Sequence, residues 1–354
     1  MIKVMIVDDS KTTREYLKHV IASDPTLYLA AEAQNGSEAV LKVAKYRPDV
    51  VIMDIQMPEM DGYDATREIM ETTPVPIVIH STLVAPEQSD NIFAALQAGA
   101  VAVAEKPPGI GHPDSDTLTR KLIRTVKLMS EVKVVKRKKQ LGKLITPPGE
   151  KSTFSQAVVV GIGASTGGPP VLQSILSSLP EGFPAPILIV QHISKGFLGG
   201  MIHWLSRDSQ LILKVPRSGE AARPGHVYFA PEETHMGITA GGNIMLSPVD
   251  PAARINRPIN YLFQSLAKNF KKNALGILLT GMGNDGAAGL KGMKQNGART
   301  LAQDRESSVI FGMPSEAIKL DAVDFVLSPR DIIEYLMIIS RNHTKMNEPS
   351  PVTD

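Results

Sequence analysis

Residues 157–169 read AVVVGIGASTGGP. A run of β-branched apolar residues ends in a turn of small residues around Ser165, and Pro169 then suits the first turn of a helix. This order of strand, tight turn and helix is typical of an α/β sheet, and it matches the context of a G-x-S-x-G nucleophile elbow. The stretch predicts a strand whose end presents the hydroxyl of Ser165.

Further runs of strand length surround this one and extend the pattern to a whole domain. Residues 211–246 carry closely spaced β-rich pieces and the turn sequence Gly241-Gly242-Asn243, which predicts an inserted β-hairpin. We therefore predict a doubly wound α/β domain over residues 154–342. Its expected strands are residues 157–162, 187–190, 226–230, 275–279, 300–302 and 325–327.

The first part of the chain repeats the alternation of short apolar runs and amphipathic stretches. It predicts a five-stranded parallel sheet with crossover helices, in a domain of residues 1–125. The expected strands are residues 3–7, 29–33, 50–53, 77–79 and 102–104, and the expected helices are residues 11–23, 36–46, 63–72 and 89–98.

Composition separates these domains. Seven Lys or Arg residues stand against one Glu between Lys127 and Lys143, and Thr146-Pro147-Pro148-Gly149 follows. This composition predicts a basic, proline-containing linker over residues 126–153. The polar residues 343–354 are predicted to form a disordered tail.

The overall composition excludes several classes of protein. The chain has 354 residues and no cysteine, so disulfides, thiolate metal sites and cysteine nucleophiles are excluded. A net charge of +2 favours no nucleic-acid partner. No segment approaches the ~18 apolar residues of a membrane span, and the start of the chain lacks the apolar core of a signal peptide. We expect a cytoplasmic protein that is not embedded in a membrane.

Acidic residues gather where the strands of the first domain end. Asp8 and Asp9 follow the first strand and Asp54 follows the third, so their carboxylates are expected at one edge of the sheet. Such a cluster favours a hard divalent cation, and Mg²⁺ fits best. Ser81 and Lys106 follow the fourth and fifth strands. One carboxylate, for which Asp54 is the candidate, could then attack a phosphoryl donor. For Asp9 taken alone, a helix cap is the simpler interpretation.

The second domain carries a candidate catalytic triad. Ser165, His192 and Asp285 each follow a predicted strand, which allows Ser165 to attack a carbonyl, His192 to move its proton and Asp285 to orient the imidazole. The backbone N–H of Thr166 is the candidate oxyanion donor. No cofactor is needed for such chemistry. Rivals for the base remain open: His203, His226 and His235.

A second class of function also fits one motif. The stretch from Gly281 to Gly286 reads GMGNDG, which has the form GxGxxG, and Asp304 follows the next strand, as in a dinucleotide site. Asp285 argues against this interpretation, because its carboxylate would repel a pyrophosphate.

The first third of the chain resembles the response-regulator receiver domain, a flavodoxin-like fold. The resemblance rests on Val7-Asp8-Asp9-Ser10, on residues 54–62 with the sequence DIQMPEMDG, on Ser81 and on Lys106-Pro107. It implies phosphorylation of Asp54 by a sensor histidine kinase, Mg²⁺ held by Asp8, Asp9 and Asp54, and a switch role for Ser81 and Lys106. Val103 stands where that family often has an aromatic switch residue.

Residues 157–327 resemble the catalytic domain of chemotaxis protein-glutamate methylesterases. The matching blocks are GIGASTGGP at 161–169, Gln191-His192, Phe229-Ala230-Pro231 with His235, LTGMGNDGA at 279–287, Gln303-Asp304 and FGMP at 311–314.

This resemblance implies hydrolysis of glutamyl methyl esters on methyl-accepting chemotaxis receptors, and deamidation of receptor glutamines. It implies the triad Ser165, His192 and Asp285, with Thr166 and Met282 beside it. Ile193-Ser194 and Arg257-Pro258-Ile259-Asn260 depart from the usual pattern. The alternative is a receiver joined to a catalytically idle module that only binds receptors or other signalling proteins.

Overall fold

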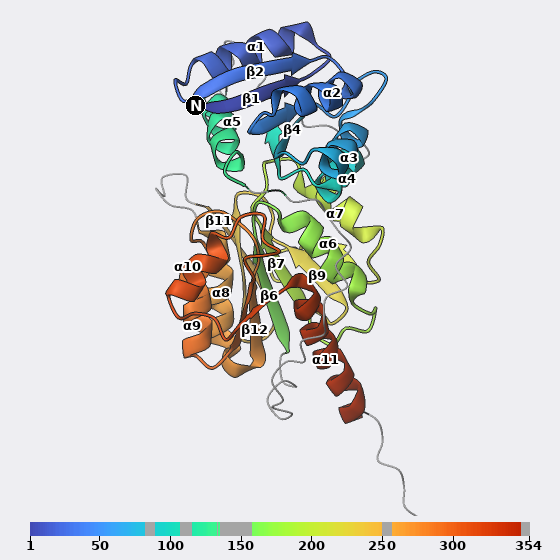
Figure 1. The fold of residues 1–354 in the computed structure, drawn as a ribbon. Coiled ribbons are helices and arrows are strands. Elements are labelled where there is room, and N and C mark those ends of the chain that lie inside the picture. Colours follow the sequence, from blue (N-terminus) through green and yellow to red (C-terminus); the bar gives the residue numbers. More distant parts are fainter. Residues whose placement is uncertain (82–88, 107–114, 133, 135–157, 250–256, 348–354) are drawn as a thin grey trace, which may run out of the picture. The chain divides into compact units, whose positions relative to one another are not determined.

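The structure is a computed structural model that describes residues 1–81, 89–106, 115–132, 134, 158–249 and 257–347 (Figure 1). The chain divides into two compact units. Most of the predicted linker, residues 126–153, lies outside the described residues, as does the end of the predicted tail, and the domain limits stay a prediction. Within the described part, the first unit's last helix runs on to Met129.

The first unit is built on five parallel strands in the order β2-β1-β3-β4-β5. Apolar β-branched residues dominate the central strands, and β3 is buried throughout, as expected for a parallel sheet covered on both faces. The predicted five-stranded parallel sheet is therefore confirmed. Its strands are β1 (Ile2–Val7), β2 (Leu27–Ala33), β3 (Val50–Met53), β4 (Ile77–Ser81) and β5 (Ala102–Glu105).

Five helices cover this sheet. α1 packs beside α5 on one face, and α2, α3 and α4 pack in series on the other. Ser10, Asn35 and Asp61 cap the first three helices by accepting a backbone N–H with their side chains, which explains where these helices begin. The helices are α1 (Lys11–Ala22), α2 (Gly36–Tyr46), α3 (Gly62–Thr72), α4 (Ser89–Ala98) and α5 (Ser115–Met129).

The second unit holds a seven-stranded parallel sheet in the order β14-β13-β12-β6-β7-β9-β8. The predicted hairpin is present as the antiparallel pair β10-β11. The short strand β8 was not predicted, because its three residues carry too little pattern. The strands are β6 (Val159–Ala164), β7 (Ile187–Gln191), β8 (Ile212–Lys214), β9 (His226–Phe229), β10 (Thr234–Ile238), β11 (Ile244–Pro248), β12 (Ala274–Leu278), β13 (Arg299–Gln303) and β14 (Phe325–Leu327).

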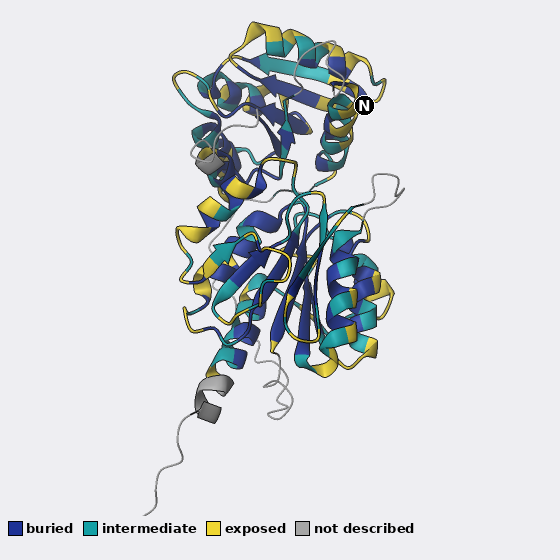
Figure 2. Cartoon of the chain, turned by 180° about the vertical axis from the view of Figure 1, so that it is seen from behind, coloured by how far each residue is buried: buried dark blue, intermediate teal, exposed yellow. Residues whose placement is uncertain are grey.

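Helices lie on both faces of the larger sheet. The strands between these helices are the most buried part of the second unit (Figure 2). α8, α9 and α10 pack together on one face, where β10 also packs on α8, while α11 packs against α6 on the other. These elements are α6 (Gly168–Ser178), α8 (Pro258–Asn269), the short 3₁₀ helix η2 (Lys271–Asn273), α9 (Ala287–Gln295), α10 (Met313–Lys319) and α11 (Pro329–Asn347). A further helix, α7 (Leu198–Ser206), belongs to the first unit up to Met201 and to the second from Ile202 on.

The strand order decides where a site can form. The chain starts in the middle of the sheet at β6, moves outward through β7, and later returns to the other side of β6 at β12. Neighbouring parallel strands that are wound in opposite directions leave a crevice at their carboxyl ends. Residues that follow β12, β6 and β7 therefore lie at one edge of the sheet.

The last helix extends beyond the predicted end of the domain at residue 342. α11 continues to Asn347, so residues 343–347 are helical where an irregular tail was predicted. The sequence holds no proline or glycine between Asn342 and Pro349 to stop the helix earlier. No helix in the described parts of the chain is long and apolar enough to cross a membrane.

Close packing of α8 on α9 yields a test of the fold. A Cβ on Gly289 would lie 2.8 Å from Phe263 Cβ and 2.9 Å from the Asn260 carbonyl oxygen. We expect Gly289→Ala to lower the free energy of unfolding by about 1–3 kcal/mol through overpacking. Urea unfolding followed by the fluorescence of the single tryptophan, the buried Trp204, measures this.

Gly292 on the same helix is the matched control, because nothing lies within 4 Å of a Cβ placed there. Gly292→Ala should stabilise the unit by about 0.5–1 kcal/mol through helix propensity alone. Equal effects of the two substitutions would contradict the packing described here.

Candidate functional site

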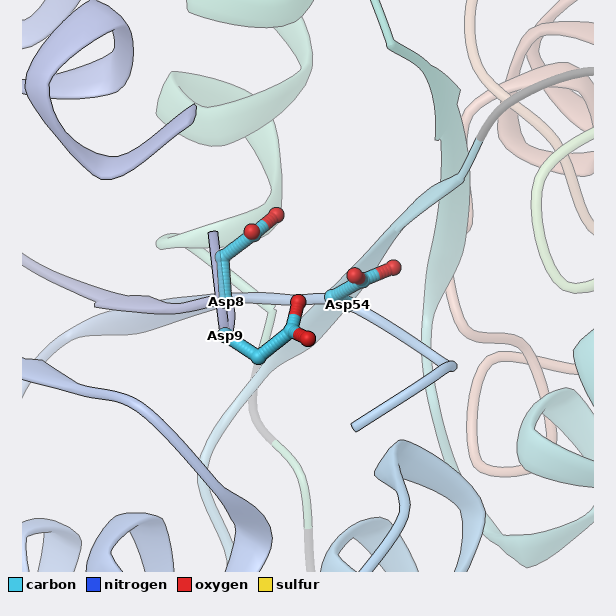
Figure 3. A group of neighbouring side chains, drawn as sticks. All are labelled: Asp8, Asp9 and Asp54. Atoms are coloured by element: carbon cyan, nitrogen blue, oxygen red, sulfur yellow. The ribbon is translucent and has the colours of Figure 1, made fainter. Parts of the chain in front are cut away.

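The three predicted acidic residues of the first unit lie together. Val7 pairs with Met53 across β1 and β3, so Asp8 and Asp9 leave the sheet beside Asp54. Asp8 and Asp54 are buried and Asp9 is exposed. One carboxylate oxygen from each residue lies within 4.8 Å of the other two, and the three side chains are neighbours (Figure 3).

Lys106 joins the two buried carboxylates. Its Nζ lies 2.9 Å from Asp8 Oδ2 and 2.7 Å from Asp54 Oδ2. Burial raises the pKa of Asp54, and the opposing effect of Lys106 does not cancel it. Burial alone would lower the pKa of Lys106, but its hydrogen bonds to Asp54 and Asp8 outweigh this and the net shift is upward. The site therefore holds an ammonium between two carboxylates, one of which is made more basic by its surroundings.

Backbone contacts hold Asp54 in place. Its Oδ1 accepts the N–H of Ile55 at 2.8 Å, and its own N–H donates to the Val7 carbonyl. Gly62 starts α3 directly against it, because a Cβ on Gly62 would lie 2.0 Å from the Asp54 carbonyl oxygen. The glycine at the end of the DIQMPEMDG stretch is thus a steric requirement of the site.

The predicted switch residues end the next two strands. Ser81 closes β4 and is buried, and its carbonyl accepts the backbone N–H of Lys106 after β5. All the sequence-predicted residues of this unit therefore lie at the carboxyl edge of its sheet. Three carboxylates that converge beside one ammonium suit a hard divalent cation and a phosphoryl group.

The predicted triad of the second unit comes from three neighbouring strands. Ser165 follows β6, His192 follows β7, and Asp285 lies in the turn between β12 and α9. Ala164 pairs with Gln191 at the ends of β6 and β7, and His192 N–H donates to the Ala164 carbonyl. The Ser165 N–H donates to the carbonyl of Thr280, so the turn after β6 is tied to the loop after β12 as well.

Asp285 has the most complete set of partners. His192 Nε2 lies 2.9 Å from its Oδ2, and the backbone N–H groups of Ile259, Asn260 and Gly286 donate to its two oxygens at 2.9–3.0 Å. The first two donors belong to the first turn of α8, where the helix dipole also favours a negative charge. These donors hold the buried carboxylate in place, oriented toward the imidazole.

The nucleophile turn leaves backbone donors unpaired. In the described part of the chain, the N–H of Thr166 has no acceptor, and neither has the N–H of Met282 in the facing loop. A Cβ on Gly281 would lie 2.5 Å from Ser165 Cβ, so the two loops are in contact. Ser165 itself forms hydrogen bonds through its backbone, and the structure gives its hydroxyl no bond to His192. Such N–H groups beside a serine suit a developing oxyanion.

The rival bases occupy other surroundings. His203 is exposed on α7, His226 Nδ1 lies 2.9 Å from the Pro224 carbonyl oxygen, and His235 stacks on the ring of Tyr261. None of these three histidines forms a hydrogen bond to Asp285 in the described part of the chain.

The loop geometry also disfavours the dinucleotide interpretation. Gly286 N–H, at the N-terminus of α9, donates to Asp285 Oδ1, so the protein's own carboxylate sits where a pyrophosphate would bind. Asp304 accepts hydrogen bonds from Ser307 in its own turn.

Several supporting residues were not predicted from sequence. Asn260 Oδ1 accepts the Gly289 N–H and so links α8 to α9. Thr280 Oγ1 lies 3.0 Å from the Thr166 carbonyl oxygen, and Thr280 N–H donates to the fully buried Gln303. Gln191 was quoted only as part of a motif. Polar residues at buried strand ends were the available signal, but nothing in the sequence names their partners.

The fold and the two sites define a two-unit protein, in which a flavodoxin-like unit with an acidic cluster precedes an α/β unit that brings a serine, a histidine and an aspartate to one edge of its sheet. A family model described as CheB methylesterase matches residues 160–336, and one described as response regulator receiver domain matches residues 4–112. The chain therefore belongs to the CheB methylesterase family.

Relatives match it over nearly their whole length. A protein-glutamate methylesterase/protein-glutamine glutaminase 1 of Syntrophus aciditrophicus is 46% identical, over 95% of this chain and 98% of that protein. One named protein-glutamate methylesterase/protein-glutamine glutaminase, of Nitrosospira multiformis, is 45% identical over 98% and 99%. The crystal structure of the Thermotoga maritima CheB methylesterase catalytic domain shares 37% identity, covering 52% of this chain and 98% of that one, with a TM-score of 0.49.

A buried histidine next to Ser81 allows a test by pH. His80 is 1% exposed, neither ring nitrogen has a hydrogen-bond partner among the described residues, and burial lowers its pKa to about 3. The pKa of His80 is therefore lower in the folded state than in the unfolded state, where it is about 6.5. Above about pH 6.5 the histidine is neutral in both states and adds no pH dependence. Below that pH the unfolded state takes up a proton that the folded state does not, so the free energy of unfolding falls as the pH falls.

We expect His80→Met to remove this loss. The difference in unfolding free energy between variant and wild type should grow in favour of the variant, by up to about 1.4 kcal/mol per pH unit below pH 6.5. Hydrogen exchange of β1 and β3 amides in the full chain, compared at equal pH, measures it. His19→Met, at an exposed position of α1, is the control. Parallel curves for wild type and His80→Met from pH 7 to 4.5 would show that the expectation is wrong.

Proposed function

We propose that this chain is a phosphorylation-activated esterase that hydrolyses glutamyl methyl esters of methyl-accepting chemotaxis receptors, releasing methanol, and that also deamidates receptor glutamines. The observation that carries the proposal is the hydrogen bond between His192 and Asp285 beside the Ser165 turn. The relatives' names and the two family matches support the same substrate class.

In the first step, Ser165 Oγ attacks the γ-carbonyl carbon of the esterified glutamate and His192 takes the hydroxyl proton. Because Nε2 faces Asp285, the Nδ1 atom is the one left to act as base. The N–H groups of Thr166 and Met282 receive the oxyanion that forms. Collapse of this intermediate breaks the ester C–O bond, and the imidazolium returns its proton to the departing methanol.

In the second step, His192 deprotonates a water molecule that attacks the acyl-enzyme. The glutamate carboxylate is released and Ser165 regains its proton. With a glutamine substrate the same sequence expels ammonia in place of methanol. Asp285 acts throughout through the imidazole, by holding its orientation and stabilising its charged form.

In the receiver unit, Asp54 is the proposed phosphoryl acceptor from a chemotaxis-type sensor histidine kinase. Its burial makes the carboxylate more basic, and Lys106 is placed to neutralise charge on the transferred oxygens. Asp8, Asp9 and Asp54 would hold Mg²⁺, which supplies further charge neutralisation when bound. Ser81 and Lys106 are the proposed switch residues. A cytoplasmic location is part of the same proposal.

The main test is methanol release from methylated receptor signalling domains, measured with and without acetyl phosphate and Mg²⁺. We expect Ser165→Ala to lower the rate by about 10³-fold or more, because the nucleophile is lost. Asp54→Ala should keep basal release but lose its increase with acetyl phosphate.

Ser174→Ala, which removes an exposed hydroxyl from α6, is the control for the first substitution. If folded, phosphodonor-treated wild type releases no methanol from several receptors, the idle binding module becomes the better interpretation. If Asp54→Ala responds fully to acetyl phosphate, phosphorylation acts elsewhere.

A second test concerns the acidic cluster. At free Mg²⁺ about 100-fold above its Kd, the wild-type receiver unit should gain about 2.7 kcal/mol of stability. We expect Asp9→Asn to lose most of this gain, with little change in the absence of the cation because Asp9 is exposed. Hydrogen exchange in β1 and β3 provides the measurement, and Asp116→Asn, an exposed position on α5, is the control. An undiminished gain in Asp9→Asn would remove Asp9 from the set of ligands.

A further inference from the structure

The side chain of Gln191 lies between the backbones of the proposed nucleophile and base. Gln191 is the last residue of β7, and its Nε2 donates to the Ser165 carbonyl at 2.9 Å and to the His192 carbonyl at 2.8 Å. One primary amide has two N–H groups, so a single side chain satisfies both bonds. The Gln191 side chain therefore links the backbone of Ser165 to that of His192.

The orientation of this amide follows from its surroundings. If the amide were turned over, its oxygen would face two carbonyl oxygens at hydrogen-bond distance, which is repulsive. In the orientation observed, Oε1 is buried and has no donor among the described residues. Gly168 makes room for it, because a Cβ there would lie 2.3 Å from Oε1.

The two hydrogen bonds from Nε2 contribute about 0.5–1.5 kcal/mol each, and a buried amide oxygen without a partner costs about 1–3 kcal/mol, so the two effects offset each other. We therefore expect Gln191 to add little net stability. Its effect lies in what the Nε2 group holds in place.

What it holds is the peptide plane between Ser165 and Thr166. In a trans peptide the C=O of one residue and the N–H of the next share a plane and point in opposite directions. The Ser165 carbonyl is drawn toward Gln191 and toward the N–H of Gly168. The N–H of Thr166 must then point the other way, and it is one of the unpaired donors of the site.

The facing loop uses the same arrangement without a side chain. The Gly281 carbonyl accepts the N–H groups of Gly312 and Met313, which turns the Met282 N–H in the opposite direction. Backbone donors therefore orient one of the two candidate oxyanion peptides. The other is held by one backbone donor, the Gly168 N–H, and by the side chain of Gln191.

We propose that Gln191 is a positioning residue, which sets the 165–166 peptide so that the Thr166 N–H meets the oxyanion and which ties this turn to the backbone of His192. The inference rests on the proposed esterase function. It predicts that Gln191 affects the rate of the chemical step and leaves receptor binding nearly unchanged.

The test compares Gln191→Met, Gln191→Glu and the control Gln173→Met. Gln173 is a buried glutamine on α6 whose amide donates to Asp208, whereas Gln191 is half-buried. Gln191→Met should lower kcat for methanol release by about 100-fold, as expected for a displaced oxyanion donor, and leave KM within roughly threefold of wild type. Gln173→Met should keep wild-type kcat at similar thermal stability.

Gln191→Glu adds a readout that a purely structural residue would not move. The ionised carboxylate repels both carbonyls, whereas the protonated acid can donate one hydrogen bond. The ratio of variant to wild-type kcat should therefore rise as pH falls and the introduced carboxylate takes up a proton.

Wild-type kcat in Gln191→Met, or equal losses in Gln191→Met and Gln173→Met, would overturn the proposal. Covalent labelling of Ser165 by a fluorophosphonate is a second measurement, which needs no receptor substrate. We expect Gln191→Met to slow this labelling as it lowers kcat. The labelling rates therefore distinguish a failure of the Gln191 proposal from a failure of the esterase proposal. If wild type is labelled but hydrolyses no receptor ester, the labelling rates still decide the role of Gln191. If wild type is neither labelled nor active, both proposals are wrong.

Discussion

The second unit depends on one carboxylate. Asp285 accepts the first backbone N–H groups of α8, the N–H that precedes α9, and the imidazole of His192. A buried charge is tolerated only when it is fully hydrogen-bonded, and these partners come from three separate segments of the chain. The requirement to satisfy one charge therefore fixes how the two helices begin and where the proposed base lies. Asn260 and Gly289 extend the same link between the helices.

The receiver unit solves a related problem with charges of opposite sign. Asp8 and Asp54 are both buried and would repel each other, and Lys106 bridges them at short distance. The two units thus share a design, in which polar groups at the carboxyl ends of neighbouring parallel strands neutralise or orient one another. They differ in what is held: the first arranges charges for a phosphoryl group, whereas the second arranges backbone N–H groups and a proton acceptor around a serine.

Backbone orientation is the less obvious part of the second site. Any two neighbouring strand ends can place a serine beside a histidine. A backbone N–H that stabilises an oxyanion must in addition point toward the position of the oxyanion. In this protein the carbonyls of Ser165 and Gly281 are each held by two donors, and the N–H groups that follow them have no acceptor among the residues that the structure describes. Three of these four donors are backbone N–H groups, and the fourth is the side-chain amide of Gln191. The orientation of the Thr166 N–H is therefore the part of this arrangement that a side-chain substitution can change.

The sequence by itself determined the two α/β units, nearly all the strands and the residues of both proposed sites, because apolar periodicity and motif spacing are local properties of the chain. It did not predict β8, whose three residues carry no pattern, or the helical residues 343–347. The triad members were named, but only the tertiary structure decided that His192, and none of the other three histidines weighed as bases, meets Asp285, and through which nitrogen. The partners of Gln191, Asn260 and Thr280 were likewise decided there, since a hydrogen bond between distant segments depends on the register of neighbouring strands and has no signal in the local sequence.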